Sequence, residues 1–410
     1  MNHLSFLTRS FSRRQWQKQG PDFCYCSLLL AGGAALLLFN GPGVVPVGRR
    51  SPLTVGMLDW LSKIMPHWPE VGSFTIACLV LGSILLLYDV GRQLFHRRLP
   101  ALLAALVYLN LVGVIGAGRS GGDAGILLWG QLVLIKGVLT SRRDWRWSWL
   151  IGFGLSAITL TEPTLGAQMA IIAIMFLLWD TPRLLKFSWF WAGVLLGLMP
   201  GAWLASQQGG WTALAGEVYP TRPHLLHLAF NLVQIMGLSL PWCIFATLGW
   251  QKSWQNLNWS WARFTLVWGG GYFLLTLFSP ALGWSALVPL LPVVALLTAI
   301  ALMEIRHWPV DQPYPALWRW SFWGLSLGFM ALGVAIYINW PLTVVVGQQR
   351  GILLLLLTFI VLTLAMTTNL LERGQREFIP ILLWGNFVCA LIVVNSFLLT
   401  ALVRLAQINS

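Results

Sequence analysis

Long apolar segments separated by short polar connections recur from one end of the sequence to the other. A helix needs roughly 17–25 mainly apolar residues to cross a bilayer, and segments near this length dominate the chain. The pattern therefore predicts an all-α, polytopic membrane protein with about thirteen transmembrane helices. The predicted spans cover residues 23–39, 71–90, 99–117, 124–140, 148–160, 165–179, 188–206, 227–249, 264–279, 284–303, 321–340, 351–371 and 378–402.

The composition agrees with a membrane protein. Charged residues make up 10% of the 410 residues, whereas a soluble domain carries about 25%. The net charge of +13 lies mostly in short connections between apolar runs, where Lys and Arg set orientation, so we predict no nucleic-acid partner. Most Lys and Arg fall on the side of the N-terminus. This bias predicts a cytoplasmic N-terminus and an outside C-terminus in the plasma (inner) membrane.

Four parts follow from this arrangement. Residues 1–22 are polar and basic, and we predict a cytoplasmic leader there. Residues 23–305 form a transmembrane core, whose first outward loop spans 40–70. Residues 306–320 are rich in Pro and Trp and are expected to form an inward linker. Residues 321–410 hold the last transmembrane helices.

The first outward loop, residues 40–70, carries several charges on a side that has few of them, among them Arg49, Arg50 and Asp59. From Pro52 to Met65, apolar and polar residues mix in a pattern typical of a short amphipathic helix lying in the membrane surface. The alternative is a segment that only joins two spans.

A glycine-rich hairpin, AGRSGGDAG, joins the third and fourth predicted spans and contains Arg119 and Asp123. Glycines allow tight turns and the close approach of a ligand. In one interpretation Arg119 holds a phosphate, because its donors form a fixed fork, and Asp123 orients it. In the other, an Arg–Asp pair closes the hairpin and Asp123 caps the next helix.

Glu162 precedes Pro163 at a turn between two predicted spans. It is a candidate general base, or a residue at the positive end of the following helix. Arg222 lies in a later outward loop near His224 and His227. These two histidines lack an evident third ligand, so we predict no metal site and no cofactor.

Two charged residues, Lys136 and Asp89, fall within or beside apolar runs. We expect each to be paired or to extend towards the interface. The cysteines are scattered on or beside apolar segments and are expected to be packing residues: Cys24, Cys26, Cys78, Cys243 and Cys389.

Several stretches, in this order and spacing, resemble the integral-membrane type C glycosyltransferases of family 39, which include protein mannosyltransferases and the aminoarabinose transferase of lipid A. They are VPVGRRSPLTVGMLDWL, RRLPALLAALVYL, GRSGGDAGILLW, SRRDWRWSWLIGFGLSAITLTEPTLG, FLLWDTPRLL, NWSWARFTLVWGGGYFLL and FSPALGWSALVPLLPVVALL. The resemblance covers roughly residues 24–305. It implies a polyprenyl-phosphate sugar as donor at the outer membrane face, with the donor and membrane lipids as partners.

The chain departs from this family at the site. Relatives carry an Asp-Glu pair soon after the first span, whose Asp acts as general base, but Leu38 to Ser51 contains no acid. Relatives have Leu-Thr-Lys-Gly where this chain has Leu160 to Pro163 with Glu162, and Thr-Lys-Leu where it has Pro280 to Leu282. Asp59, Asp123 and Glu162 are the candidates to replace the missing acid. Arg49, Arg50, Arg119 and Arg222 are the candidates to bind the donor phosphate.

Three hypotheses remain, because a fold does not determine a function. The chain is a divergent transferase acting on a lipid, glycan or protein acceptor, a non-catalytic relative that binds a lipid-linked sugar or a partner protein, or a transporter of lipids or solutes. Substitution of the three candidate acids separates the first two hypotheses. Transport would instead require Lys136 or Asp89 inside the spans. The sequence identifies no protein partner, sugar or acceptor.

Overall fold

The computed structural model describes residues 13–38, 51–65, 71–119, 122–207, 225–278, 287–306, 308, 314–338 and 350–395. Every regular element in these ranges is a helix, which confirms the predicted all-α class. In chain order they are α1 (Arg13–Leu37), α2 (Pro52–Ile64), α3 (Val71–Phe95), α4 (Arg98–Leu109), α5 (Val112–Arg119), α6 (Asp123–Ser141), η1 (Trp145–Ser148), α7 (Trp149–Thr161), α8 (Pro163–Asp180), η2 (Pro182–Lys186), α9 (Ser188–Gln207), α11 (Leu225–Ser239), α12 (Cys243–Gln255), α13 (Ser260–Phe264), η3 (Thr265–Gly270), α14 (Gly271–Phe278), η4 (Val288–Leu290), α16 (Leu291–Arg306), α17 (Ala316–Tyr337), α18 (Arg350–Glu372) and α19 (Phe378–Asn395).

Within the described residues, each predicted span overlaps one helix or consecutive helices. In the described part of the chain, five helical segments are by themselves long and apolar enough to cross a membrane, and the number rises to seven if each of two bent helix pairs counts as one span. The total of about thirteen spans remains a prediction.

The two bent pairs interrupt predicted spans. α4 and α5 meet at 60°, and Asn110, the C-cap of α4, donates its Nδ2 to the Leu106 carbonyl at 2.8 Å. α11 and α12 meet at 102°, next to Pro241, which has no backbone N–H to continue a helix. The span predicted over residues 227–249 is therefore not one straight helix.

Apolar side chains cover the outside of the bundle as well as its interior. On α9, Leu196, Met199 and Trp203 are each more than 60% exposed. A soluble protein does not expose contiguous apolar faces of this kind, whereas lipid tails solvate them. The chain is an integral, multi-pass membrane protein.

Glycines bring neighbouring helices close together at their crossings. A Cβ atom on Gly152 of α7 would lie 2.7 Å from the Gly193 carbonyl oxygen of α9, and one on Gly249 of α12 would collide with the Leu297 carbonyl of α16. Small residues at helix crossings allow the tight packing that drives association inside a bilayer.

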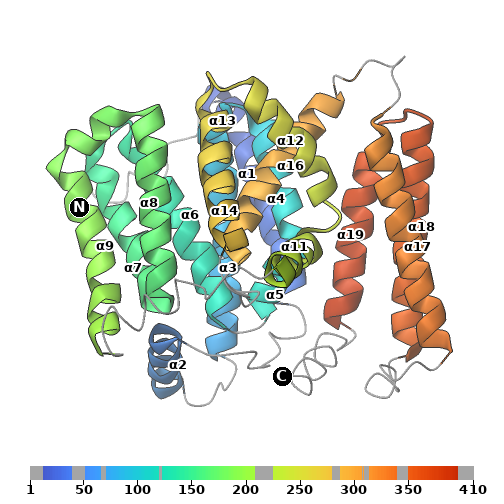
Figure 1. The fold of residues 1–410 in the computed structure, drawn as a ribbon, viewed down its shortest axis with the longest axis horizontal. Helices are drawn as coiled ribbons and strands as arrows, with labels where there is room; N and C mark the ends of the chain where they lie inside the picture. The colour runs from blue at the N-terminus through green and yellow to red at the C-terminus, as the bar shows by residue number, and fades with distance from the viewer. Residues whose placement is uncertain are drawn as a thin grey trace.

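The last three helices stand together at one side of the bundle, with α7, α8 and α9 at the opposite side (Figure 1). Phe245 of α12 links them to the core, because its ring lies 5.0 Å from Trp318 of α17 and 6.0 Å from Phe378 of α19.

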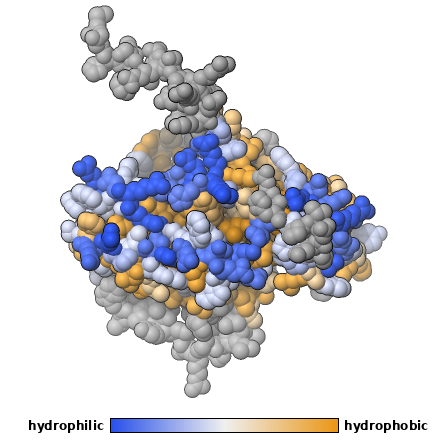
Figure 2. Space-filling model, turned by 90° about the horizontal axis from the view of Figure 1, so that it is seen from above, coloured by the Kyte–Doolittle hydropathy of each residue, from blue (hydrophilic) through white to orange (hydrophobic). Residues whose placement is uncertain are grey.

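The two ends of the bundle differ. α2 lies at one end, and α13 lies at the other (Figure 1). Figure 2 views the end that carries α13, where hydrophilic residues gather. Basic residues follow the helices that finish there, such as His96 after α3 and Arg142 after α6.

Candidate functional site

Helix α2 (Pro52–Ile64) forms where the sequence predicted a short amphipathic helix over residues 52–65, which confirms the helix, while its place in the membrane surface stays a prediction. Ser51 is its N-cap, with an extended backbone (φ −67°, ψ 158°), and its Oγ accepts from the Thr54 N–H at 3.3 Å. Pro52 follows at the first helical position, where its missing N–H costs nothing. The side chain of Thr54 is buried and that of Trp60 is exposed, so one face of α2 meets the protein.

The Asp123 carboxylate holds the start of α2. Its Oδ2 accepts from the Ser51 N–H at 2.9 Å, and its Oδ1 accepts from the Ser51 Oγ at 2.9 Å and from the Thr54 Oγ1. Asp123 is the first residue of α6, whose N-cap is Gly122. The idea that Asp123 is the N-cap of its own helix is therefore wrong, because Gly122 holds that position and the Asp123 side chain binds Ser51 and Thr54 at the start of α2.

This contact joins the two segments that carry most candidate site residues. The first outward loop and the glycine-rich hairpin lie about seventy residues apart in sequence, yet they meet at Ser51, Thr54 and Asp123. α2 also packs against α3 and α7. Ser51 and Thr54 were not among the predicted site residues, although the Ser-Pro pair before an amphipathic run is a recognisable helix start.

Arg119 ends α5 close to this junction. Its side chain is buried, with 5% exposure, and its Nη1 donates to the Leu37 carbonyl at the end of α1 at 3.3 Å. A guanidinium stays charged when buried, and a buried charge is costly unless polar partners surround it. The fold therefore keeps a cation in the interior, four residues before Asp123.

Asp59 lies on the exposed side of α2. It forms an ion pair with Lys63 at 2.6 Å, one helical turn later, and the two side chains are 58% and 73% exposed. A surface pair of this kind contributes only about 0.3–0.5 kcal/mol.

Glu162 occupies the turn between α7 and α8, as the sequence predicted. It holds the N-cap position of α8, but its side chain makes no capping hydrogen bond. Thr164 Oγ1 donates to Glu162 Oε1 at 3.4 Å. Because α2 packs against α7, Glu162 follows a helix that belongs to the same junction.

The remaining candidates lie outside the described residues. These are Arg49, Arg50 and Arg222. Within the described ranges, no group of three His, Cys, Asp or Glu could hold a metal ion.

No protein-family model and no curated protein matches the sequence. Among solved structures, the chain is similar to ArnT from Cupriavidus metallidurans bound to undecaprenyl phosphate. The two share 15% identity and a TM-score of 0.65, over 92% of this chain and 77% of the other. The apo state of the same enzyme gives 16% identity and a TM-score of 0.65, over 93% and 77%. The chain therefore has the fold of an integral-membrane type C glycosyltransferase, as its resemblance to family 39 implied.

Proposed function

We propose that this protein transfers a sugar from a polyprenyl-phosphate donor to a lipid, glycan or protein acceptor at the outer membrane face. The observation that carries the proposal is the common fold with an enzyme whose structure holds undecaprenyl phosphate. A likeness of fold does not by itself establish an activity, so the residues at the junction of α2 and α6 supply the rest of the reasoning.

The donor phosphate is proposed to bind beside Arg119, with help from Arg49, Arg50 and Arg222. Arg49 and Arg50 directly precede Ser51, which Asp123 fixes at the start of α6. Arg50 and Arg49 precede Ser51 by one and two residues in the sequence, which is the reason for proposing them as phosphate ligands. Arginine suits a phosphate because two parallel N–H donors match its oxygens.

Glu162 is our first choice for the general base. Asp123 uses both oxygens to hold α2, and Asp59 pairs with Lys63 in an exposed position. Both roles are structural in character. A base must reach the acceptor hydroxyl at about 2.6–3.2 Å, and Glu162 lies at the turn that follows α7, which α2 contacts.

Because Asp59 and Asp123 are both held in contacts with other side chains, one alternative is also favoured. It is a non-catalytic relative that binds a lipid-linked sugar or a partner protein. In that case the junction holds a ligand and no acid removes a proton. Transport receives less support, since Lys136 is paired with Asp89, as the sequence analysis expected.

We place the protein in the plasma (inner) membrane, with α2 outside, the N-terminus in the cytoplasm and the C-terminus outside. Basic residues at the opposite end support this orientation. We retain the proposed division into a leader (1–22), a core (23–305), a linker (306–320) and C-terminal helices (321–410).

The test measures binding of a polyprenyl-phosphate sugar to the purified protein, together with sugar transfer to membrane lipid, glycan and peptide acceptors. Arg119→Gln is expected to weaken donor binding about tenfold or more, because a hydrogen bond to a charged group contributes about 1.5–3 kcal/mol. Arg119→Lys keeps the charge but loses the fork, and serves as a second variant if the first misfolds.

Glu162→Gln is expected to keep donor binding and to lower transfer about 10²–10⁴-fold, the range of a general base. Asp59→Asn is the matched control and should change neither. Donor binding without transfer to any acceptor would favour the non-catalytic alternative. If the wild-type protein binds no donor, both the proposed transferase activity and the lipid-linked-sugar binding of the alternative would be refuted.

A further inference from the structure

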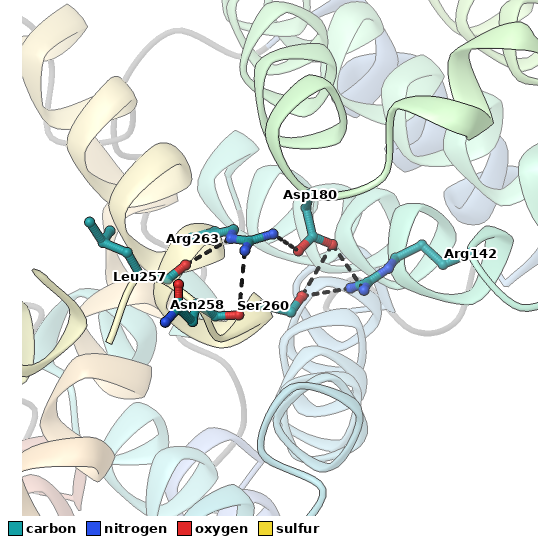
Figure 3. A network of polar contacts seen from close by, with 6 residues as sticks. All are labelled: Arg142, Asp180, Leu257, Asn258, Ser260 and Arg263. Atoms are coloured by element: carbon teal, nitrogen blue, oxygen red, sulfur yellow. Dashed lines mark hydrogen bonds and ion pairs between the residues drawn. The ribbon is translucent and has the colours of Figure 1, made fainter. Parts of the chain in front are cut away.

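A buried carboxylate organises the end of the bundle opposite α2. Asp180, the last residue of α8, has a side chain that is 3% exposed and pairs with Arg142 at 2.9 Å and with Arg263 at 3.5 Å. Ser260 lies between them, donating to Asp180 at 3.3 Å and accepting from Arg142 at 2.7 Å (Figure 3). The network joins the ends of α6 and α8 to the start of α13.

The network carries an excess positive charge. One carboxylate is shared by two guanidinium groups, and Arg263 is further held by the carbonyls of Leu257 and Asn258 (Figure 3). Asp89 of α3 and Asp144, which follows α6, have partners of their own. Asp89 pairs with Lys136, and Asp144 accepts from the Arg146 N–H at 3.0 Å.

A cavity of about 220 Å³, lined mostly by polar residues, opens beside this network. It lies where α3, α6 and α8 end and α13 begins. Its polar lining residues are Gln93, His96, Arg142, Arg143, Thr181 and Ser260.

Two lining residues have donors that the fold leaves available. The hydroxyl oxygen of Thr181 is buried and has no hydrogen-bond partner, and a buried hydroxyl without a partner is costly. Arg143 is exposed, and its guanidinium makes no ion pair or hydrogen bond with any described residue. These donors, together with the charge on Arg142, suit a group that is anionic and rich in acceptors.

We propose that this cavity binds a phosphate group, supplied by the headgroup of an anionic phospholipid or by a soluble phosphate. A phosphate offers several acceptor oxygens to Arg143, Thr181 and Arg142, and a guanidinium matches them two at a time. The site stands at the end where basic residues gather, so an anionic leaflet there would raise the local concentration of its ligand. The proposal does not depend on glycosyl transfer, because the site lies at the other end of the bundle.

The test uses the full chain, purified in a neutral detergent. Native mass spectrometry measures the retention of phosphatidylglycerol, with diacylglycerol as the lipid that lacks phosphate, and calorimetry measures the binding of inorganic phosphate. Arg143→Gln is expected to weaken binding about tenfold, since it removes a charge-assisted contact. Thr181→Val keeps the shape of the side chain, removes the hydroxyl, and is expected to weaken binding about fivefold.

Arg146→Gln is the matched control. It removes the same charge from the same connection, but Arg146 lies over the Trp145 ring at 5.9 Å and does not line the cavity. Arg146→Gln should leave the affinity for phosphatidylglycerol and phosphate within about twofold of the wild-type value. This result would distinguish binding at the cavity from a general attraction of anions to the basic end of the protein.

Retention of phosphatidylglycerol alone would assign the site to a lipid headgroup, and binding of inorganic phosphate alone would assign it to a soluble ligand. Binding of both would show that the phosphate itself is recognised. The proposal is overturned if neither binds, if diacylglycerol is retained equally well, or if Arg143→Gln and Thr181→Val behave like Arg146→Gln.

Discussion

Replacement of Asp123 by alanine removes the carboxylate that holds α2 at the start of α6. Three hydrogen bonds disappear, from the Ser51 N–H, the Ser51 Oγ and the Thr54 Oγ1. Each bond to a charged acceptor contributes about 1.5–3 kcal/mol, but bonds that share one group are not additive. Ser51 and Thr54 also retain their mutual contact at 3.0 Å. We therefore expect a net loss of about 2–3 kcal/mol in the attachment of α2.

The assay is hydrogen exchange of the α2 backbone amides. A helix of 13 residues is marginal by itself in water, so its protection reflects its attachment to the protein. A loss of about 2–3 kcal/mol raises exchange about 30- to 150-fold. Asp59→Ala is the control, and because its ion pair is exposed, it should change exchange by no more than about twofold.

Asp123→Asn distinguishes an anchor from a base. The asparagine retains one acceptor oxygen, and its amide can donate to the hydroxyl of Ser51 or Thr54, so we expect a rise of only about fivefold in exchange. If Asp123 removes the acceptor proton, asparagine should abolish transfer as completely as alanine does. Unchanged protection of α2 in Asp123→Ala would refute the anchoring role, as would equal effects of alanine and asparagine on exchange.

Other predictions concern stability, measured by unfolding in mixed micelles. Asp180→Ala should lower the free energy of unfolding by about 3–5 kcal/mol, because it leaves two arginines without their buried partner. Glu304→Gln, which removes the partly exposed ion pair with Lys252, should lower the free energy of unfolding by no more than about 1 kcal/mol. Equal losses in Asp180→Ala and Glu304→Gln would contradict the buried role of Asp180. Gly249→Val should cost about 1–3 kcal/mol or more through its collision with α16. Gly324→Val, whose Cβ meets nothing within 4 Å, should be close to neutral, and a similar loss there would argue against the close crossing.

Local features of the sequence were sufficient for the class and for most elements. A long apolar run satisfies its own backbone in a membrane only as a helix, so the predicted spans coincide with helices. α2 was also predictable, because Pro52 favours a helix start and the mixed apolar and polar residues after it define an amphipathic helix. Both signals lie within the helix itself. The bend between α11 and α12 occurs next to Pro241, and the missing N–H of that residue is equally local.

The candidate site depended on contacts between distant segments. Asp123 was singled out from its hairpin, but its partners Ser51 and Thr54 lie 72 and 69 residues away, and no local pattern links them. Asp180 drew no attention in the sequence, yet Arg142 and Arg263 converge on it from two other helices.

Local sequence patterns thus define a helical membrane protein with basic connections and an amphipathic helix near residues 52–65, because hydrophobic runs, caps and charge bias act over short distances. Only the tertiary structure decided which acid is an anchor, which arginine is buried and where a polar cavity opens. Those outcomes depend on how helices pack side by side, and packing joins residues whose separation along the chain carries no signal of their contact.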